Sequence, residues 1–211
     1  LEAGDVLQVG GTPTGARGYL CVAGGFDAPE VLGSRSALEP ARAGDTIACA
    51  PSRTEPRGLG FCVGSPRRPA PALRVLPGPQ RDWFTDDLFV TQEYVVTPAS
   101  NRMGLRLTGA PLARRPGELV SEAVAPGAVQ VANDGLPIVL GADGQTIGGY
   151  PKVAHVIRAD LDRLAQLRPG DRVRFVPVTH DEAAAAARER AAFLREWVTR
   201  LRIAERRPVV G

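Results

Sequence analysis

The sequence predicts a mainly β protein in which β-barrel subdomains are followed by a C-terminal α-helix. Turn-forming residues are frequent, with 24 Gly and 19 Pro among 211 residues. Short runs of Val, Leu and Ile lie between them, which is typical of strands. A Gly-Asp pair followed by a strand-like run occurs three times. The end of the chain instead has the three- and four-residue apolar spacing of an amphipathic helix.

The three Gly-Asp pairs predict tight turns that lead into strands. They are Gly4-Asp5 before residues 6–9, Gly44-Asp45 before 46–49 and Gly170-Asp171 before 172–176. Glycine tolerates the positive φ of such a turn, and aspartate can accept hydrogen bonds from the local backbone. We therefore assign these aspartates a structural role and no catalytic one.

Further strands are predicted wherever a short apolar run stands between turn residues. These runs are 18–25, which is expected to be buried, and 73–76, 88–90, 94–96, 103–107, 128–131, 136–140 and 153–157. Asn133-Asp134-Gly135 predicts a hairpin turn between two of them. The Pro- and Arg-rich stretch 51–72 predicts a linker, and residues 161–167 predict a short helix. We expect an N-terminal β subdomain over 1–72 and a β-barrel subdomain over 73–178.

The third segment, 179–211, holds the predicted C-terminal helix and tail. Thr179 and Glu182 have the spacing of a capping box. One apolar stripe follows: Ala187, Ala191, Leu194, Trp197, Val198 and Leu201. Such a stripe covers either the chain's own barrel or a partner. We favour the barrel, because amphipathic surface helices usually pack on their own domain.

The composition argues against several classes of protein. The net charge is +3 with scattered basic residues and only 5% aromatic residues, so a nucleic-acid surface is not expected. No apolar run reaches the roughly 18 residues of a membrane span. Cys21, Cys49 and Cys62 form no C-x-x-C pair. This predicts neither a metal site nor a disulfide framework, and it fits the reducing cytoplasm.

Familiar catalytic motifs are also missing from the sequence. It has no G-x-x-x-x-G-K-[ST] phosphate loop for ATP, no G-x-S-x-G elbow and no H-E-x-x-H. His155 and His180 lack metal-ligand spacing, and His155 within an apolar run is expected to be structural. The chain is therefore expected to bind no metal and no cofactor by itself.

Polar residues gather instead in three segments of the strand-rich region. They are S-N-R-M-G at 100–104, P-G-A-V-Q-V at 126–131 with D-G at 134–135, and D-G-Q-T-I-G-G-Y-P at 143–151, just before the only lysine, Lys152. Strand alternation places Gln130 on the opposite face from Val129 and Val131. The Gly148-Gly149 pair allows a ligand to approach the backbone closely.

These three segments resemble the signature of the KipA and carboxyltransferase family, which includes allophanate hydrolase subunit 2 and the C subunit of 5-oxoprolinase. The D-x-Q-T-x-G-G-Y-P block is the most specific part, and the similarity extends over about residues 1–177. The family has a glycine-rich stretch after S-R-S, which here is nearly absent after Ser36. We expect the N-terminal subdomain to be truncated at its start relative to the family.

The resemblance implies cyclophilin-like β-barrels and a KipI-like B subunit as partner. It also implies one of three functions. The first is a subunit of an ATP-dependent 5-oxoprolinase-type amide hydrolase, with a LamB/YcsF-like A subunit and ATP handled by the partners. The second is the carboxyltransferase half that moves a carboxyl group from carboxybiotin to urea or a similar amide. The third is a KipA-type regulator that binds a kinase inhibitor without catalysis.

The residues allow a small amide or lactam substrate. We predict that Asp143 or Asp134 acts as general acid or base and that Lys152 stabilises negative charge. Substrate binding is assigned to a larger set: Asn101, Arg102, Gln130, Gln145, Thr146, Gly148, Gly149 and Tyr150. Three of these assignments have structural alternatives. Asp134-Gly135 can be only a hairpin turn, Asn101-Arg102 can only cap strands, and Tyr150 can be core.

Overall fold

The computed structural model describes residues 4–12, 15–37, 39–52 and 72–204. Contacts divide the chain into two units. One comprises Leu1–Arg17 with Val63–Glu196, and the other comprises Gly18–Cys62 with Trp197–Gly211. Each unit is described below by itself.

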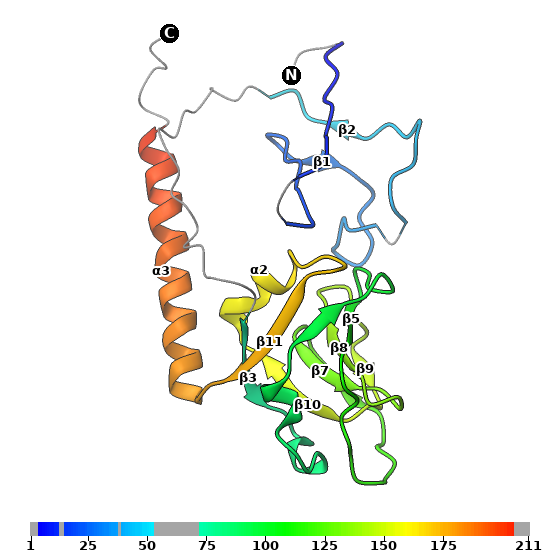
Figure 1. Cartoon of the computed structure of the whole chain (residues 1–211). Helices are drawn as coiled ribbons and strands as arrows, with labels where there is room; N and C mark the ends of the chain where they lie inside the picture. Colours follow the sequence, from blue (N-terminus) through cyan, green and yellow to red (C-terminus); the bar gives the residue numbers. More distant parts are fainter. Residues whose placement is uncertain (1–3, 13–14, 38, 53–71, 205–211) are drawn as a thin grey trace. The chain divides into compact units, whose positions relative to one another are not determined.

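Seven strands of the first unit close into a barrel (Figure 1). In order around it they are β10 (Lys152–Val156), β3 (Ala72–Pro77), β11 (Arg172–Pro177), β4 (Tyr94–Val96), β5 (Gly104–Thr108), β8 (Pro137–Leu140) and β7 (Ala128–Val131). Strands β3 and β11 are parallel, and the other neighbours are antiparallel. Closure gives each of these seven strands a partner on both sides, so none of them is an edge strand.

The barrel core is formed by the inward-facing side chains of these strands and by three aromatic rings. Phe89 stacks on Phe175 with ring centroids 4.5 Å apart, and Tyr94 meets Phe175 edge-on at 5.6 Å. All three side chains are buried. Aromatic packing of this geometry adds to the apolar area that the core removes from water.

Short elements connect the strands. They are η1 (Arg81–Trp83), α1 (Leu88–Thr91), β6 (Glu122–Ala123), β9 (Ile147–Gly148), η2 (Arg158–Asp160) and α2 (Leu161–Leu164). Strands β6 and β9 pair into a ribbon, with Glu122 opposite Gly148. At the η2 corner the buried Asp160 carboxylate accepts two bonds from the Arg74 guanidinium, at 2.7 and 3.0 Å, and a third from the Arg74 backbone N–H.

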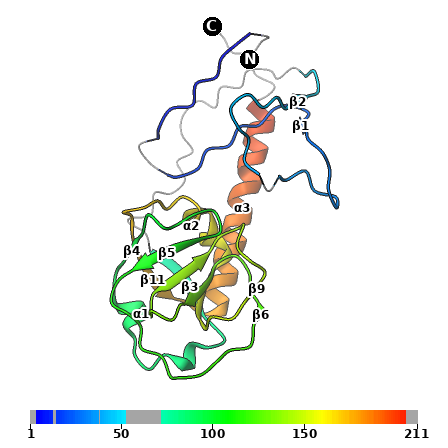
Figure 2. The ribbon, with the colours of Figure 1, turned by 90° about the vertical axis from the view of Figure 1, so that its right-hand side faces the viewer.

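Helix α3 (His180–Ala204) begins at the predicted capping box. The Glu182 carboxylate accepts the Thr179 N–H at 2.7 Å, and the Thr179 hydroxyl accepts the Glu182 N–H at 3.2 Å. The part of the helix that belongs to the first unit, residues 180–196, runs beside the barrel (Figures 1 and 2), where Arg190 pairs with Asp162. Leu194 of the apolar stripe stays 47% exposed. In the described part of the chain, no helix has the length and hydropathy needed to cross a membrane.

The second unit has little regular structure among its described residues. Strand β1 (Phe26–Asp27) pairs antiparallel with β2 (Ala48–Cys49). The Arg35 guanidinium lies 3.2 Å from Asp27 and 3.7 Å from Glu30.

Most of the predicted elements are confirmed. Seven predicted strands match β3, β4, β5, β7, β8, β10 and β11 to within one residue at either end. The mainly β class, the barrel and the C-terminal helix are thus confirmed. Gly4, Gly44 and Gly170 have φ values of 95°, 93° and 92°, as the Gly-Asp turns require. Asp45 and Asp171 accept the expected local backbone bonds.

Other predicted elements are wrong. Residues 88–90 form helix α1, because the Asp86 carboxylate accepts the Leu88 N–H and the Asp87 carbonyl accepts the N–H groups three and four residues later. Residues 6–9 and 18–25 form no strand, since no described strand pairs with their backbone. Tyr19, expected to be buried, is 80% exposed. The predicted 46–49 strand shortens to β2 and the 161–167 helix to α2. Most of the predicted linker 51–72 lies outside the described residues.

Candidate functional site

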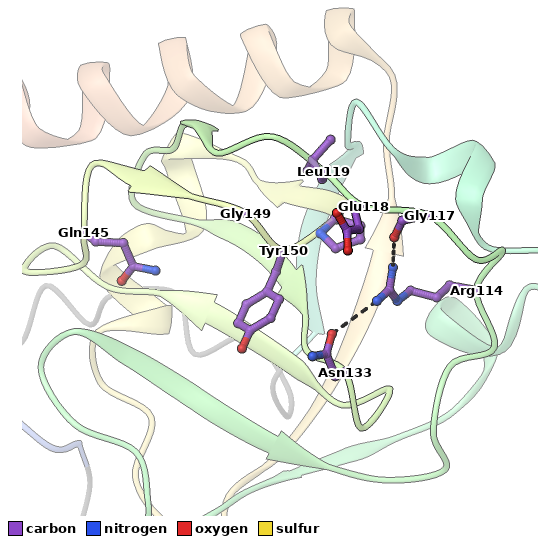
Figure 3. A pocket seen from close by; sticks show the side chains of 9 residues that line it. Arg114, Gly117, Glu118, Leu119, Asn133, Gln145, Gly149 and Tyr150 are labelled. Carbon is purple, nitrogen blue, oxygen red and sulfur yellow. Dashed lines mark hydrogen bonds between the residues drawn. The ribbon is translucent and has the colours of Figure 1, made fainter.

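A polar cleft of about 450 Å³ opens on the barrel beside the β6–β9 ribbon. Two chain segments and the turn between β7 and β8 supply its walls, which are Arg114, Gly117, Glu118, Leu119, Asn133, Gln145, Gly149, Tyr150 and Pro151 (Figure 3). The volume is within the range of small-molecule sites. The guanidinium, carboxylate, amide and phenol groups can together donate to a carbonyl and accept from an N–H.

Arg114 fixes one wall of the cleft. Its guanidinium donates to the Asn133 side-chain oxygen at 3.2 Å and to the Gly117 carbonyl at 3.4 Å, as Figure 3 shows. These bonds tie the 114–119 segment to the hairpin turn. They leave Arg114 as a cation within the lining, able to pair with a substrate carboxylate.

An ion pair between a buried lysine and a partly exposed glutamate lies next to this wall. The Lys152 ammonium is 2.6 Å from Oε1 of Glu122 and 3.4 Å from the Tyr150 carbonyl. Gln80 joins the pair from both sides, because its Nε2 donates to Glu122 at 2.8 Å and its Oε1 accepts the Lys152 backbone N–H at 3.0 Å. The hydrogen bond from Lys152, followed by that from Gln80, holds the pKa of the Glu122 carboxyl below its usual range.

Gln130 forms the second buried polar contact at the cleft. Its side chain is 1% exposed, and its Oε1 lies 3.5 Å from Nε2 of the cleft residue Gln145. Its own Nε2 has no hydrogen-bond partner among the described residues. A Cβ added to Gly148 would lie 2.3 Å from this Nε2. Gly148 is therefore required by the close approach of the β9 backbone to Gln130.

Several predicted site residues come together here, and others do not. Gln145, Gly149 and Tyr150 line the cleft, while Gln130, Gly148 and Lys152 lie behind it. Lys152 has only 6% of its side chain exposed, so it cannot contact a substrate directly in this structure. The predicted role of Lys152 in stabilising negative charge stays a prediction, and it can act only through the groups that Lys152 contacts, Glu122 and the Tyr150 carbonyl.

The remaining predicted residues do not line the cleft. Asp143 and Arg102 form an exposed ion pair of 3.4 Å. Asn101 accepts the Met103 N–H at 2.9 Å within a tight turn, and Asp134 accepts the Leu136 N–H at 2.9 Å in the hairpin turn. For Asn101 and Asp134 these are the local structural roles given above as alternatives. The Thr146 side chain is exposed, and its carbonyl accepts the Val124 N–H.

The structure adds residues that the sequence did not indicate. Arg114, Glu118 and Asn133 line the cleft, and Gln80 and Glu122 hold Lys152. Glu122 lies 30 residues before Lys152 and outside any recognisable motif. The sequence contains one indirect sign of such a residue, which is Lys152 itself. If this lysine is buried, its charge requires an acidic partner somewhere in the chain. In the described part of the chain, no group of three His, Cys, Asp or Glu could hold a metal ion.

The first unit thus combines a closed barrel, a polar cleft and the Lys152–Glu122 ion pair beside that cleft. The sequence model for "Carboxyltransferase domain, subdomain A and B" matches residues 1–177, and the chain belongs to this family.

Relatives within the family support this assignment. The chain is 36% identical over 218 residues to the 5-oxoprolinase C subunit of Escherichia coli, which covers 95% of this chain and 69% of that protein. It is 36% identical over 208 residues to the Haemophilus influenzae 5-oxoprolinase C subunit, covering 92% and 66%. The crystal structure of the K. lactis urea amidolyase superposes with a TM-score of 0.71 at 26% identity, covering 85% of this chain and 13% of that one. The chain thus spans about two thirds of its bacterial relatives and a small part of the yeast enzyme.

Proposed function

We propose that this chain belongs to an ATP-dependent 5-oxoprolinase-type amide hydrolase, in which it acts with a KipI-like B subunit and a LamB/YcsF-like A subunit. The observation that carries the proposal is the polar cleft, in a chain 36% identical to two 5-oxoprolinase C subunits. The net reaction converts 5-oxoproline, ATP and two water molecules into glutamate, ADP and phosphate. ATP binding belongs to the partners in this proposal, because the sequence has no phosphate loop.

The chemistry of the cleft suits this substrate. 5-Oxoproline presents a carboxylate, a lactam carbonyl and a lactam N–H. Arg114 can pair with the carboxylate, and the side-chain amides of Gln145 and Asn133 can donate to the carbonyl. Arg114 and Asn133 are held together by their hydrogen bond, and Gln145 bonds to the buried Gln130, which favours orientation of the bound substrate.

A carboxyltransferase half is the second candidate. The family match and the likeness to urea amidolyase favour it. The donors at Arg114, Asn133 and Gln145 also fit the ureido oxygen of a biotin group. Carboxybiotin would supply the carboxyl group, and this chain would hold and orient the acceptor amide.

The test is co-expression with the neighbouring subunits and an assay for glutamate released from 5-oxoproline with ATP. Glutamate that depends on this chain supports the hydrolase. A complex that releases no glutamate, but carboxylates urea from a carboxylated biotin carrier, supports the second candidate. A stable complex with neither activity overturns both and leaves the KipA-type regulator. The cytoplasmic location expected from the cysteines stays a prediction.

A further inference from the structure

The two oxygens of the Glu122 carboxylate have different surroundings. Both donors, the Lys152 ammonium at 2.6 Å and the Gln80 amide at 2.8 Å, bond to Oε1. Oε2 accepts no hydrogen bond from any described residue. The Glu122 side chain is 41% exposed. One oxygen is thus anchored, and the other is open to a ligand.

The anchor is rigid because its parts are buried. The Lys152 side chain is 6% exposed, and Gln80 is 8% exposed as a residue. A buried lysine and a buried amide that share one carboxylate oxygen fix the orientation of the whole group. An oriented carboxylate without competing bonds at its outer oxygen is a ready acceptor.

Glu122 lies next to the cleft, although it is not one of the lining residues. It pairs with Gly148 in the β6–β9 ribbon, directly before the cleft residue Gly149. The Lys152 ammonium that holds it also bonds to the carbonyl of Tyr150, another cleft residue. The ribbon therefore places a second carboxylate, besides that of the lining residue Glu118, at the border of the cleft.

We propose that Oε2 of Glu122 accepts the N–H of the amide, lactam or urea substrate, and that Lys152 and Gln80 are positioning residues for this carboxylate. The inference rests on the proposed amide-processing function and deepens it. A carboxylate carries no proton to donate, so this subsite selects an unsubstituted N–H and rejects an N-alkyl group. The lowered pKa of Glu122, caused first by the Lys152 bond and then by the Gln80 bond, keeps it ionised near neutral pH.

The test is Glu122→Gln in the complete complex, measured by calorimetric binding of 5-oxoproline and of N-methyl-5-oxoproline. In the variant, Lys152 and Gln80 still donate to the side-chain oxygen of the new glutamine. Its NH₂ group therefore takes the place of Oε2 and faces the substrate N–H. Wild type should prefer 5-oxoproline over its N-methyl form by at least about tenfold. Glu122→Gln should weaken 5-oxoproline binding by at least about tenfold and lose this preference. The matched control, Glu189→Gln on the exposed face of α3, should bind as wild type.

Lys152→Met separates positioning from a structural role. This variant should lower the preference for 5-oxoproline over N-methyl-5-oxoproline while the complex stays assembled and folded. If the lysine is purely structural, that preference stays unchanged. Equal binding of both ligands by wild type, or unchanged binding by Glu122→Gln, overturns the inference while leaving the hydrolase intact. Failure of wild type to bind 5-oxoproline overturns the hydrolase instead. Urea and tetramethylurea, which has no N–H, then test the same acceptor. Equal binding of the two, or failure to bind urea, overturns the inference as well.

Discussion

Gly148→Ala adds one methyl group between the β6–β9 ribbon and the barrel wall. The new Cβ would lie 2.3 Å from Nε2 of Gln130, whereas ordinary contact begins at 3.4 Å. The two groups must move apart by about 1 Å. Gln130 is 1% exposed and cannot swing into solvent, so the ribbon or the barrel wall must yield.

The expected cost follows from this geometry. Extra atoms forced into a packed site cost about 1–3 kcal/mol. For a unit of this size, about 2 kcal/mol corresponds to a fall in Tm of roughly 4–8 °C. The contact between Gln130 and the cleft residue Gln145 should be lost as well, so substrate binding should weaken together with stability.

A double-mutant cycle measures the cause directly. Thermal and urea unfolding are compared for wild type, Gly148→Ala, Gln130→Ala and the double variant. Gly148→Ala should cost about 2 kcal/mol with Gln130 present and close to nothing when Gln130 is truncated, a coupling of more than about 1 kcal/mol. Gly10→Ala, whose Cβ would meet nothing within 4 Å, is the matched control. Equal costs in both backgrounds would refute the steric reasoning.

Three further predictions test the scaffold and the cleft. Asp160→Asn should lower the free energy of unfolding by about 3 kcal/mol, because it removes the buried negative charge that pairs with the Arg74 guanidinium. Burial raises the pKa of Asp160, but the bonds from Arg74 outweigh this and hold that pKa below its usual range. Its stabilisation is therefore complete above the pKa of the unfolded chain and lost as the pH falls through the folded pKa, so urea titrations of the two proteins should converge in acid. Thr179→Ala should cost about 1 kcal/mol in urea unfolding, as for other lost N-caps, and no loss would contradict the capping box. Gln145→Ala should abolish activity of the complex while lowering Tm by less than about 3 °C, and loss of fold would indicate a structural role.

Local sequence patterns predicted most of the barrel, because its strands are short apolar runs bounded by turn residues. The failures occur where local pattern is ambiguous. Leu88-Phe89-Val90 fits a strand as well as a helix. The helix forms because the Asp86 side chain accepts the Leu88 N–H and because Phe89 stacks against Phe175, 86 residues later. The apolar run 18–25 had the composition of a buried strand, but burial requires a partner surface that no local pattern contains.

The cleft was predictable only where its residues are close together in sequence. Gln145, Gly149 and Tyr150 belong to one segment, and that segment does line the cleft. Gln80 and Glu122 reach Lys152 across 72 and 30 positions, through barrel closure and ribbon pairing. Strand register decides such contacts, and register is a property of the assembled sheet.

The placement of buried polar groups argues that the region behind the cleft is maintained for orientation and not for stability. Among the described residues, the buried polar side chains are Gln80, Gln130, Lys152 and Asp160. The first three lie behind the cleft. Buried ion pairs and amides are seldom more stabilising than apolar side chains of the same volume, so a barrel selected for stability alone would favour apolar residues there. What these groups provide is a fixed direction for Glu122 and for Gln145, the two side chains through which the buried network reaches the cleft.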